Sequence, residues 1–174
     1  MNKSVFMERK WAMPNKHTFS IPPIHKLLEK ECVGYKDIID PFANDNKEFA
    51  RITNDLNPEM DTDYHLDAYD FLCLFPTNSV DMVLYDPPYS PRQVSESYKN
   101  VGHEVTALDT SAQWRKKHLD EIQRILRVGG KCISFGWNSN GVGKKRNFQI
   151  EQILLVAHGG SHNDTIVTVE RKIG

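Results

Sequence analysis

Residues 80–89 read Val-Asp-Met-Val-Leu-Tyr-Asp-Pro-Pro-Tyr, an apolar run followed by an acid, two prolines and an aromatic ring. The apolar part is typical of a buried strand. Because Pro87 and Pro88 cannot donate backbone hydrogen bonds, they turn the chain out of the sheet here. The carbonyl oxygens of Asp86 and Pro87 stay free to accept hydrogen bonds, and an ionised Asp86 side chain accepts more. With the Tyr89 ring as a stacking face, this corner is predicted to hold an amino group, in preference to a structural loop with a capping acid.

Apolar segments on both sides of this stretch predict further strands. Two of them run into an acid, Asp40 and Asp55, as the strand before Asp86 does. The last two are rich in Ile, Leu and Val and predict an antiparallel hairpin that turns at residues 158–161. The predicted strands are residues 35–40, 50–55, 80–85, 131–135, 149–157 and 165–169.

Helices are expected between several of these strands. The longest starts after a cap at Thr110 or Ser111 and is stopped by Gly129 and Gly130. Strands separated by helices predict an α/β fold, a doubly wound and mostly parallel sheet with a terminal antiparallel hairpin. Ligands of such sheets bind beyond the carboxyl ends of the strands. The expected helices cover residues 24–31, 68–75 and 112–127.

The composition narrows the classes of function. The 174 residues show no repeat or linker, so residues 1–174 read as one domain. A net charge of −1 excludes a uniformly basic nucleic-acid-binding surface. No apolar run approaches the ~20 residues that span a bilayer, and no apolar leader follows Met1, so no membrane partner and a cytoplasmic location are expected. Three scattered cysteines fit a reducing compartment, and seven histidines without ligand spacing predict no metal.

Residues 86–89 resemble the catalytic tetrapeptide of the amino-methyltransferases that use S-adenosylmethionine, especially the adenine-specific (N6) DNA methyltransferases. Four further segments resemble that family's motifs in the same order, from about residue 11 to 172. The variety that the chain resembles is that of small phage or prophage enzymes, through residues 86–93 and 134–139. Residues 19–24 resemble the part that closes over the methionine of the cofactor, and residues 40–43 resemble the first cofactor motif. Residues 53–58 resemble the ribose-binding strand end, and residues 66–72 resemble the motif that binds the adenine of the cofactor.

The resemblance implies S-adenosylmethionine as the cofactor and the N6 amine of adenine in DNA as the methyl acceptor. The Asp86 carboxylate and the Pro87 carbonyl would accept the two hydrogens of that amine, and Tyr89 would stack on the base after it leaves the duplex. Pro88 completes the catalytic set. The residues implied in cofactor binding are Phe19, Ile21, Asp40, Pro41, Phe42, Asp55, Asp67 and Ala68.

The sequence departs from the family in two ways. The first motif carries no glycine, although Asn and Asp at 44–46 tolerate left-handed turns. The chain also has no room for a separate target-recognition domain, which leaves recognition to its own surface, a second copy or a partner subunit. Residues 90–109 lack periodicity and are expected to be a mobile loop, and residues 141–143 are expected to be another. Residues 90–109 and the basic residues 144–146 are expected to flank the catalytic mouth. The basic residues weighed as DNA phosphate contacts against a solvated face are Arg92, Lys99, Lys144, Lys145 and Arg146, together with the basic triplet at residues 115–117.

Two alternatives remain at this stage. One is methyl transfer to another planar amine, such as cytosine N4, an RNA base or a protein amide. The other is a degenerate methyltransferase fold that serves as a binding subunit, which the glycine-free first motif favours and the intact residues 86–89 oppose. The absence of a Pro-Cys pair at the turn argues against methylation of the cytosine ring, which needs a thiolate.

Overall fold

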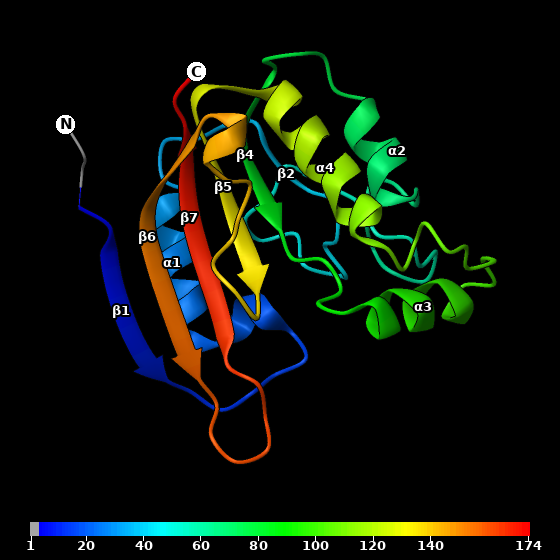
Figure 1. The fold of residues 1–174 in the computed structure, drawn as a ribbon, viewed down its shortest axis with the longest axis horizontal. Helices are drawn as coiled ribbons and strands as arrows, with labels where there is room; N and C mark the ends of the chain where they lie inside the picture. Colours follow the sequence, from blue (N-terminus) through cyan, green and yellow to red (C-terminus); the bar gives the residue numbers. More distant parts are fainter. Residues whose placement is uncertain (1–3) are drawn as a thin grey trace.

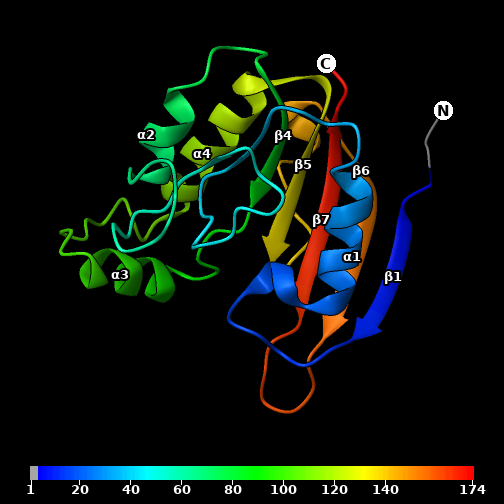
Figure 2. The same cartoon turned by 180° about the vertical axis from the view of Figure 1, so that it is seen from behind.

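A computed structural model describes residues 4–174 and shows one seven-stranded sheet (Figures 1 and 2). The strand order is β1-β6-β7-β5-β4-β2-β3. Neighbouring strands are parallel except at β7, which runs antiparallel to both β5 and β6. The strands are β1 (Phe6–Trp11), β2 (Ile38–Asp40), β3 (Ile52–Thr53), β4 (Val80–Tyr85), β5 (Leu126–Gly136), β6 (Phe148–Ala157) and β7 (Thr165–Lys172). The predicted mostly parallel sheet with a terminal hairpin is confirmed.

Helices cover both faces of the sheet, as a doubly wound fold requires. One face carries α1 (Pro22–Glu31), and the other carries α2 (Ala68–Cys73) and α4 (Ala112–Ile125). A fourth helix, α3 (Pro91–Asn100), lies beyond the end of β4 (Figure 1). Two short 3-10 helices complete the set, η1 (Thr18–Ser20) and η2 (Lys144–Arg146).

Strand β4 lies inside the sheet between β2 and β5, and its side chains feed both layers of the core. Met82 and Leu84 pack with the α1 cluster, whereas Val83 and Tyr85 pack with the cluster under α2 and α4. All four are fully buried. A parallel strand that is covered on both faces reads as a continuous apolar run, which is why the sequence identified β4 so readily.

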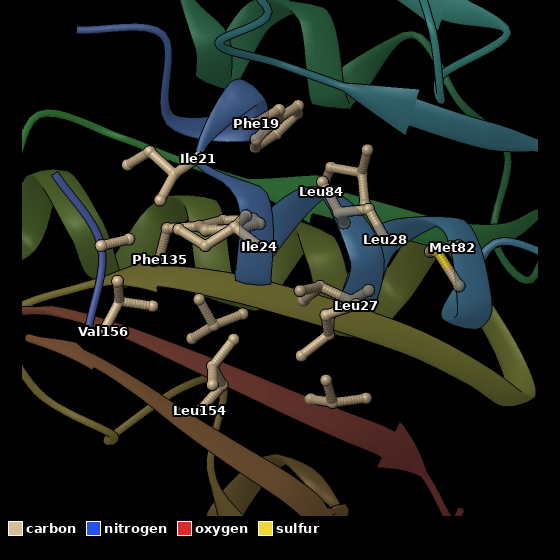
Figure 3. Packing of buried hydrophobic residues seen from close by; sticks show 14 of the residues in the cluster. Phe19, Ile21, Ile24, Leu27, Leu28, Met82, Leu84, Phe135, Leu154 and Val156 are labelled. Carbon is tan, nitrogen blue, oxygen red and sulfur yellow. The ribbon is translucent and has the colours of Figure 1, made fainter. Parts of the chain in front are cut away.

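The α1 layer is built from a helix that starts on two prolines. Proline is favoured in the first helical turn because its missing N–H would have no partner there, and Pro22 opens α1 in this way. Ile24, Leu27 and Leu28 then fall on one side of the helix and pack against β5, β6 and β7 (Figure 3). Each such burial contributes roughly 1.5–3 kcal/mol, so α1 fixes the segment that enters it from Phe19.

Several predicted boundaries were wrong, for local reasons. Helix α4 ends at Ile125, and β5 starts at Leu126, so the two glycines lie inside β5 rather than beyond the helix. The register with β4 shifts at this point, and a Cβ on Gly130 would approach the Asp81 carbonyl oxygen to 2.8 Å. Gly129 has a φ of 86°. These glycines permit a bulge with close backbone approach.

Two elements were not predicted. Strand β1 pairs in parallel with the outer edge of β6, although all but one of its residues are exposed. Helix α3 occupies the first half of the segment 90–109 that was expected to be a mobile loop. Its Ser90 cap, a proline in its first turn and the buried pair Val94 and Tyr98, four residues apart, are ordinary helix signals. No helix within residues 4–174 is both long and apolar enough to cross a membrane.

Candidate active site

The corner at residues 86–89 is held by a short hydrogen-bond network. The Tyr89 hydroxyl donates to Oδ1 of Asp86 at 2.6 Å, which holds the phenol and the carboxylate together. The Tyr89 backbone N–H donates to Oε1 of Gln93 at 2.6 Å, and the Ser90 hydroxyl caps α3 by accepting from the Gln93 N–H. The strand end, the proline turn and the first turn of α3 therefore form one stiff unit.

Burial gives Asp86 an unusual pKa. Desolvation raises its pKa to about 6, while hydrogen bonds from the hydroxyls of Tyr89 and Thr18 act in the opposite direction. The pKa of Tyr89 is also raised, by its own desolvation and by the nearby Asp86 carboxylate, so Tyr89 keeps its proton at neutral pH. Above about pH 6 the corner thus presents an ionised carboxylate beside a neutral phenol.

Asp40 holds the neighbouring turn at the end of β2. Its Oδ1 accepts the Phe42 backbone N–H at 2.9 Å, whereas its Oδ2 is buried with no hydrogen-bond partner among the described residues. Desolvation, with Asp86 and Asp55 adding repulsion, raises the pKa of Asp40 well above its usual range, against the Phe42 N–H. A buried carboxyl in this position favours the neutral form, which leaves Asp86 and Asp55 as the charged acids of this edge.

The glycine-free turn after Asp40 uses asparagine instead. Asn44 has a φ of 55°, the left-handed region that asparagine adopts more easily than most residues. Its backbone N–H donates to Oδ2 of Asp55 at 3.0 Å, and Oδ1 of Asp55 accepts the Asn57 N–H at 2.9 Å. Desolvation raises the pKa of Asp55, and these two N–H groups offset part of that rise.

Asn54 links its own loop to the loops at Pro41 and Leu66, a role that the sequence did not indicate. Its fully buried Nδ2 donates to the carbonyl oxygens of Pro41 at 3.1 Å and Leu66 at 2.9 Å. Its Oδ1 accepts the Leu66 N–H at 2.9 Å. An asparagine in a polar stretch gives no sequence signal for such a role, because its value comes from segments that only the fold brings together.

A cleft of about 450 Å³, here called the main cleft, opens at this edge of the sheet. A side pocket of about 310 Å³ adjoins it and shares Thr18, Phe42, Asn44 and Asp86 with it. Such volumes lie in the usual range for small-molecule and cofactor sites. The main cleft is lined by Asn15, Lys16, Thr18, Phe42, Asn44, Asp55, Leu56, Asp86, Pro87, Pro88, Tyr89, Gln93, Val94, Ser97, Tyr98 and Trp114.

Phe42 packs against a cluster of aromatic rings. The Phe42 ring lies 5.7 Å from Tyr85, 5.9 Å from Trp114 and 5.8 Å from His118, centroid to centroid. His118 is fully buried, and its Nδ1 shares a 2.9 Å hydrogen bond with the Tyr85 hydroxyl. Desolvation lowers the pKa of His118 to about 3. The imidazole is therefore neutral at physiological pH and serves as a packing surface for the cleft wall.

The structure brings together only part of the predicted site. Phe42, Asp55 and the four residues 86–89 line the main cleft, and Phe19 lines the side pocket. Asp67 does not line either cavity: its carboxylate caps α2 by accepting the Tyr69 N–H at 2.9 Å and also accepts from the Tyr98 hydroxyl. The other predicted cofactor residues are buried behind the cavity walls; they are Ile21, Asp40, Pro41 and Ala68.

The predicted basic residues fall into two separate groups. Arg92 and Lys99 are exposed on α3, the helix that lines the main cleft with its other side. The expectation that Lys144, Lys145 and Arg146 flank the catalytic mouth is wrong. These three residues lie just before β6, whose first residue pairs with Lys172 at the edge of the sheet where β4 and β5 begin. Asp86 lies at the opposite edge, where β4 and β5 end (Figure 1). Arg146 is moreover paired with Asp120 at 2.8 Å.

The loop that was expected to be mobile at residues 141–143 is clamped by a buried acid on β7. Glu170 is fully buried, and its carboxylate accepts the backbone N–H groups of Val142 at 2.6 Å and Gly143 at 3.0 Å. Gly141 has a φ of 55°, and a Cβ there would overlap the same carboxylate. Desolvation raises the pKa of Glu170, opposed by the two N–H groups and by Arg115. The clamp fixes residues 137–140 beside Tyr89.

Groups of three or more histidine, cysteine or acidic side chains with an arrangement that could hold a metal ion do not occur within residues 4–174. No family model and no curated protein matches the sequence. The findings about relatives therefore come from the fold.

Solved structures do share this fold. TrmN from Thermus thermophilus matches 88% of this chain with 16% identity and a TM-score of 0.56, and the chain spans about half of TrmN, 49% of its length. The 1,6-didemethyltoxoflavin-N1-methyltransferase from Burkholderia thailandensis, solved with 1,6-didemethyltoxoflavin and S-adenosylhomocysteine, matches 87% of this chain and 77% of its own, with 13% identity and a TM-score of 0.60. An rRNA methylase from Streptococcus thermophilus matches 94% of this chain and all of its own, with 12% identity and a TM-score of 0.53. The chain has the Rossmann-like fold of these methyltransferases.

Proposed function

We propose that this chain transfers a methyl group from S-adenosylmethionine to the exocyclic N6 amine of adenine in DNA. The observation that carries the proposal is the corner at Asp86, where the Asp86 carboxylate, Pro87 and the Tyr89 ring line a cleft at the carboxyl edge of the sheet. The fold supports methyl transfer as the chemistry, since the matching solved structures include methyltransferases of several substrates.

The residues of the main cleft fit the cofactor. Asp55 offers carboxylate lone pairs to the two ribose hydroxyls, and Leu56 and Phe42 offer apolar surface to a purine. The volume of about 450 Å³ suits a nucleoside, and the adjoining side pocket at Phe19 leaves room for an amino-acid tail. Asp67 would act at one remove, by holding the Tyr98 hydroxyl in the cleft wall.

When bound, S-adenosylmethionine supplies an electrophilic methyl group on a positively charged sulfur. The amine of adenine is a poor nucleophile because its lone pair is delocalised into the ring. Asp86 and the Pro87 carbonyl would each accept one N–H of that amine, which localises the lone pair on nitrogen and aims it at the methyl group. Orientation of this kind supplies much of the rate. A carboxylate with a pKa near about 6 can also take the proton that the nitrogen releases.

This role predicts a pH dependence with a defined sign. Asp86 must be ionised to accept its hydrogen bond from the amine and then the released proton, and its pKa is raised to about 6. We therefore expect kcat/KM to be constant above about pH 7 and to fall as the pH drops through 6. Initial rates with labelled cofactor between pH 5 and 9 measure this. A profile that stays flat down to pH 5 would contradict the assignment, and Asp86→Asn should lack the acidic limb.

Asp55→Ala should weaken cofactor binding at least tenfold. Hydrogen bonds to a charged acceptor contribute about 1.5–3 kcal/mol, and every 1.4 kcal/mol is tenfold in affinity. Isothermal titration calorimetry with S-adenosylhomocysteine gives the dissociation constant directly. Asp61→Ala is the matched control, because Asp61 is an exposed acid on the following loop, paired with Lys47 at 2.7 Å and outside the cleft. Equal affinity of a folded Asp55→Ala and the wild type would reject the ribose contact.

The substrate class is tested by one assay with parallel arms. Tritiated cofactor is offered with DNA, RNA and protein substrates, and the methylated product is hydrolysed and identified. The RNA arm is included because one structural neighbour is an rRNA methylase. N6-methyladenine in DNA is the expected product. Methylated product in the RNA or protein arm alone would show that RNA or protein, and not DNA, is the methyl acceptor. No product in any arm, with cofactor bound, favours the binding-subunit alternative.

A further inference from the structure

A third cavity, of about 370 Å³, lies on the other side of the catalytic corner and is here called the Arg115 cavity. Pro88, Tyr89 and Trp114 line both it and the main cleft, so the two spaces share a wall. Asp86 and Asp55 line the main cleft but not this cavity. A cofactor in the main cleft would therefore leave the Arg115 cavity open beside the Tyr89 ring.

Arg115 of α4 is the cationic side chain of this cavity, and it has no anionic partner. The guanidinium lies over the ring of Tyr85, 5.4 Å from its centroid, and is half-buried. Within residues 4–174 no carboxylate pairs with it and no acceptor takes a hydrogen bond from it, whereas six other arginines are paired with carboxylates. A partly desolvated charge without a partner is unfavourable, so the site is one that an anion would complete.

The carboxylates around Arg115 are already engaged elsewhere. Asp109, which lines the same cavity, accepts the Thr106 N–H at 2.9 Å and the Thr106 hydroxyl at 2.7 Å. Glu170, whose pKa Arg115 lowers, accepts the two N–H groups of the 141–143 clamp. Neither acid turns to the guanidinium, whose five donors stay available to a ligand.

Neutral donors line the same cavity as Arg115. Asn138 and Asn140 reach it from the loop that Glu170 clamps. Oδ1 of Asn138 accepts the Asn140 backbone N–H at 3.0 Å, which orients the Asn138 amide and leaves its NH2 group without a protein acceptor in the described part of the chain. A planar guanidinium and amide N–H groups that line one cavity form a donor set suited to phosphate oxygens.

We infer that the Arg115 cavity binds a phosphodiester of the substrate strand next to the target nucleotide, with Arg115 as the phosphate-binding residue. The inference rests on the proposed function, because it names the side from which that substrate approaches. The strand would then pass the Tyr89 ring opposite the cofactor, and a base unstacked from it would enter the corner at Asp86. The fork of Arg115, held over Tyr85 before any substrate arrives, is pre-organised for this contact.

The test is binding of a fluorescein-labelled single-stranded oligodeoxynucleotide, followed by anisotropy over a range of NaCl concentrations. A second labelled probe of the same length is abasic throughout and offers phosphates alone. Arg115→Met removes the charge and keeps an unbranched apolar stem over Tyr85. The control is Lys116→Met, which makes the same change of net charge one residue along α4 at a side chain that is exposed and outside the cavity. Thermal melting and S-adenosylhomocysteine titration verify that each variant is folded.

Arg115→Met should weaken binding of both probes about tenfold and reduce the slope of log affinity against log salt by about 0.7, the value for one phosphate on a single strand. Lys116→Met should stay within twofold of the wild type. Equal effects of the two variants, or no effect of either, overturn the inference. Should Arg115→Met not fold, Arg115→Lys decides: it keeps the charge, so an unchanged slope with weaker binding supports the inference, and unchanged binding overturns it.

The binding readout separates this inference from the proposed function. If the wild type transfers no methyl group to any nucleic acid but Arg115→Met still loses the strand, the cavity stands and the proposed reaction fails. If the wild type methylates DNA while Arg115→Met binds both probes as the Lys116→Met control does, the cavity assignment alone fails.

Discussion

Asp86→Ala should lower the rate of methyl transfer by about 10²–10³-fold or more, the usual loss when one well-placed electrostatic partner is removed. Affinity for S-adenosylhomocysteine should stay within a few-fold, because Asp86 acts on the amine and not on the nucleoside part of the cofactor. The Asp86 carboxylate accepts hydrogen bonds from the hydroxyls of Tyr89 and Thr18. Single-turnover rates with saturating cofactor measure the loss without contributions from product release.

Asp86→Asn refines the same test. The amide keeps the shape and one acceptor oxygen but loses the charge, and its NH2 group meets the target amine donor to donor. We expect a small residual activity that exceeds that of Asp86→Ala. Burial raises the pKa of Asp86 from 3.8 to about 6, so the protein carries a penalty for ionising it that grows as the pH rises from about 4 to about 6 and is constant above that. Asp86→Asn should therefore unfold at a higher temperature than the wild type at pH 8, and the difference should shrink at pH 4. Wild-type rates in both variants would show that Asp86 is not catalytic.

The second large effect concerns stability. Glu170→Ala should lower the free energy of unfolding by about 2–6 kcal/mol, because the buried N–H of Val142 and the partly buried N–H of Gly143 both lose their acceptor and each orphaned group costs roughly 1–3 kcal/mol. That is a large share of the total of about 5–15 kcal/mol expected for a domain. Glu170→Gln should cost less, since its amide oxygen still accepts one N–H. Urea denaturation measured by circular dichroism gives both values.

Glu8→Gln is the control for the loss of a carboxylate. Glu8 lies on β1 and pairs with Lys10 at 2.9 Å in a partly exposed position near the surface, where ion pairs contribute about 0–1 kcal/mol. Gly141→Ala provides an independent route to the same clamp, because the added methyl group would overlap the Glu170 carboxylate at a backbone φ of 55°. Denaturation midpoints of Glu170→Ala and Gly141→Ala that match that of Glu8→Gln would show that the clamp does not stabilise the fold.

The parts of the fold that sequence reasoning predicted are those with a local cause. A fully covered parallel strand reads as the apolar run of β4, and a pair of prolines marks its end at Asp86. The C-terminal hairpin is rich in branched apolar residues around a turn that contains two glycines. By contrast, β1 reads Phe-Met-Glu-Arg-Lys-Trp, with no alternation, because an edge strand exposed on both sides needs none. Its place in the sheet depends on β6, which lies at the other end of the chain.

The candidate site shows the same limit. Asp55 was found because it follows a strand end, and strand ends of a parallel sheet meet at one edge. Phe42 was found because residues 40–43 resemble a cofactor motif. Asp67 has the right sequence context, but the Tyr98 hydroxyl occupies its carboxylate, and α3, which carries Tyr98, was not predicted. The basic residues at 144–146 were misplaced because the loop after β5 runs back along the sheet before β6 begins (Figure 1). Arg115 stood in a basic triplet that gave no sign of which member turns inward.

The parallel pairing of β1 with β6 also dictates an order of events during synthesis. The imidazole of His158 donates to the Ala12 carbonyl, 146 residues away, and β1 aligns with β6 along its whole length. Ribosomes add about 5–20 residues per second, so β1 waits roughly 7–30 s for its partner to emerge. During that time Phe6, Met7 and Trp11 have no strand beside them. Strand β1 thus joins the sheet only after β6 has been made, and a nascent chain that stalls before β6 leaves the backbone N–H and C=O groups of β1 without a partner strand.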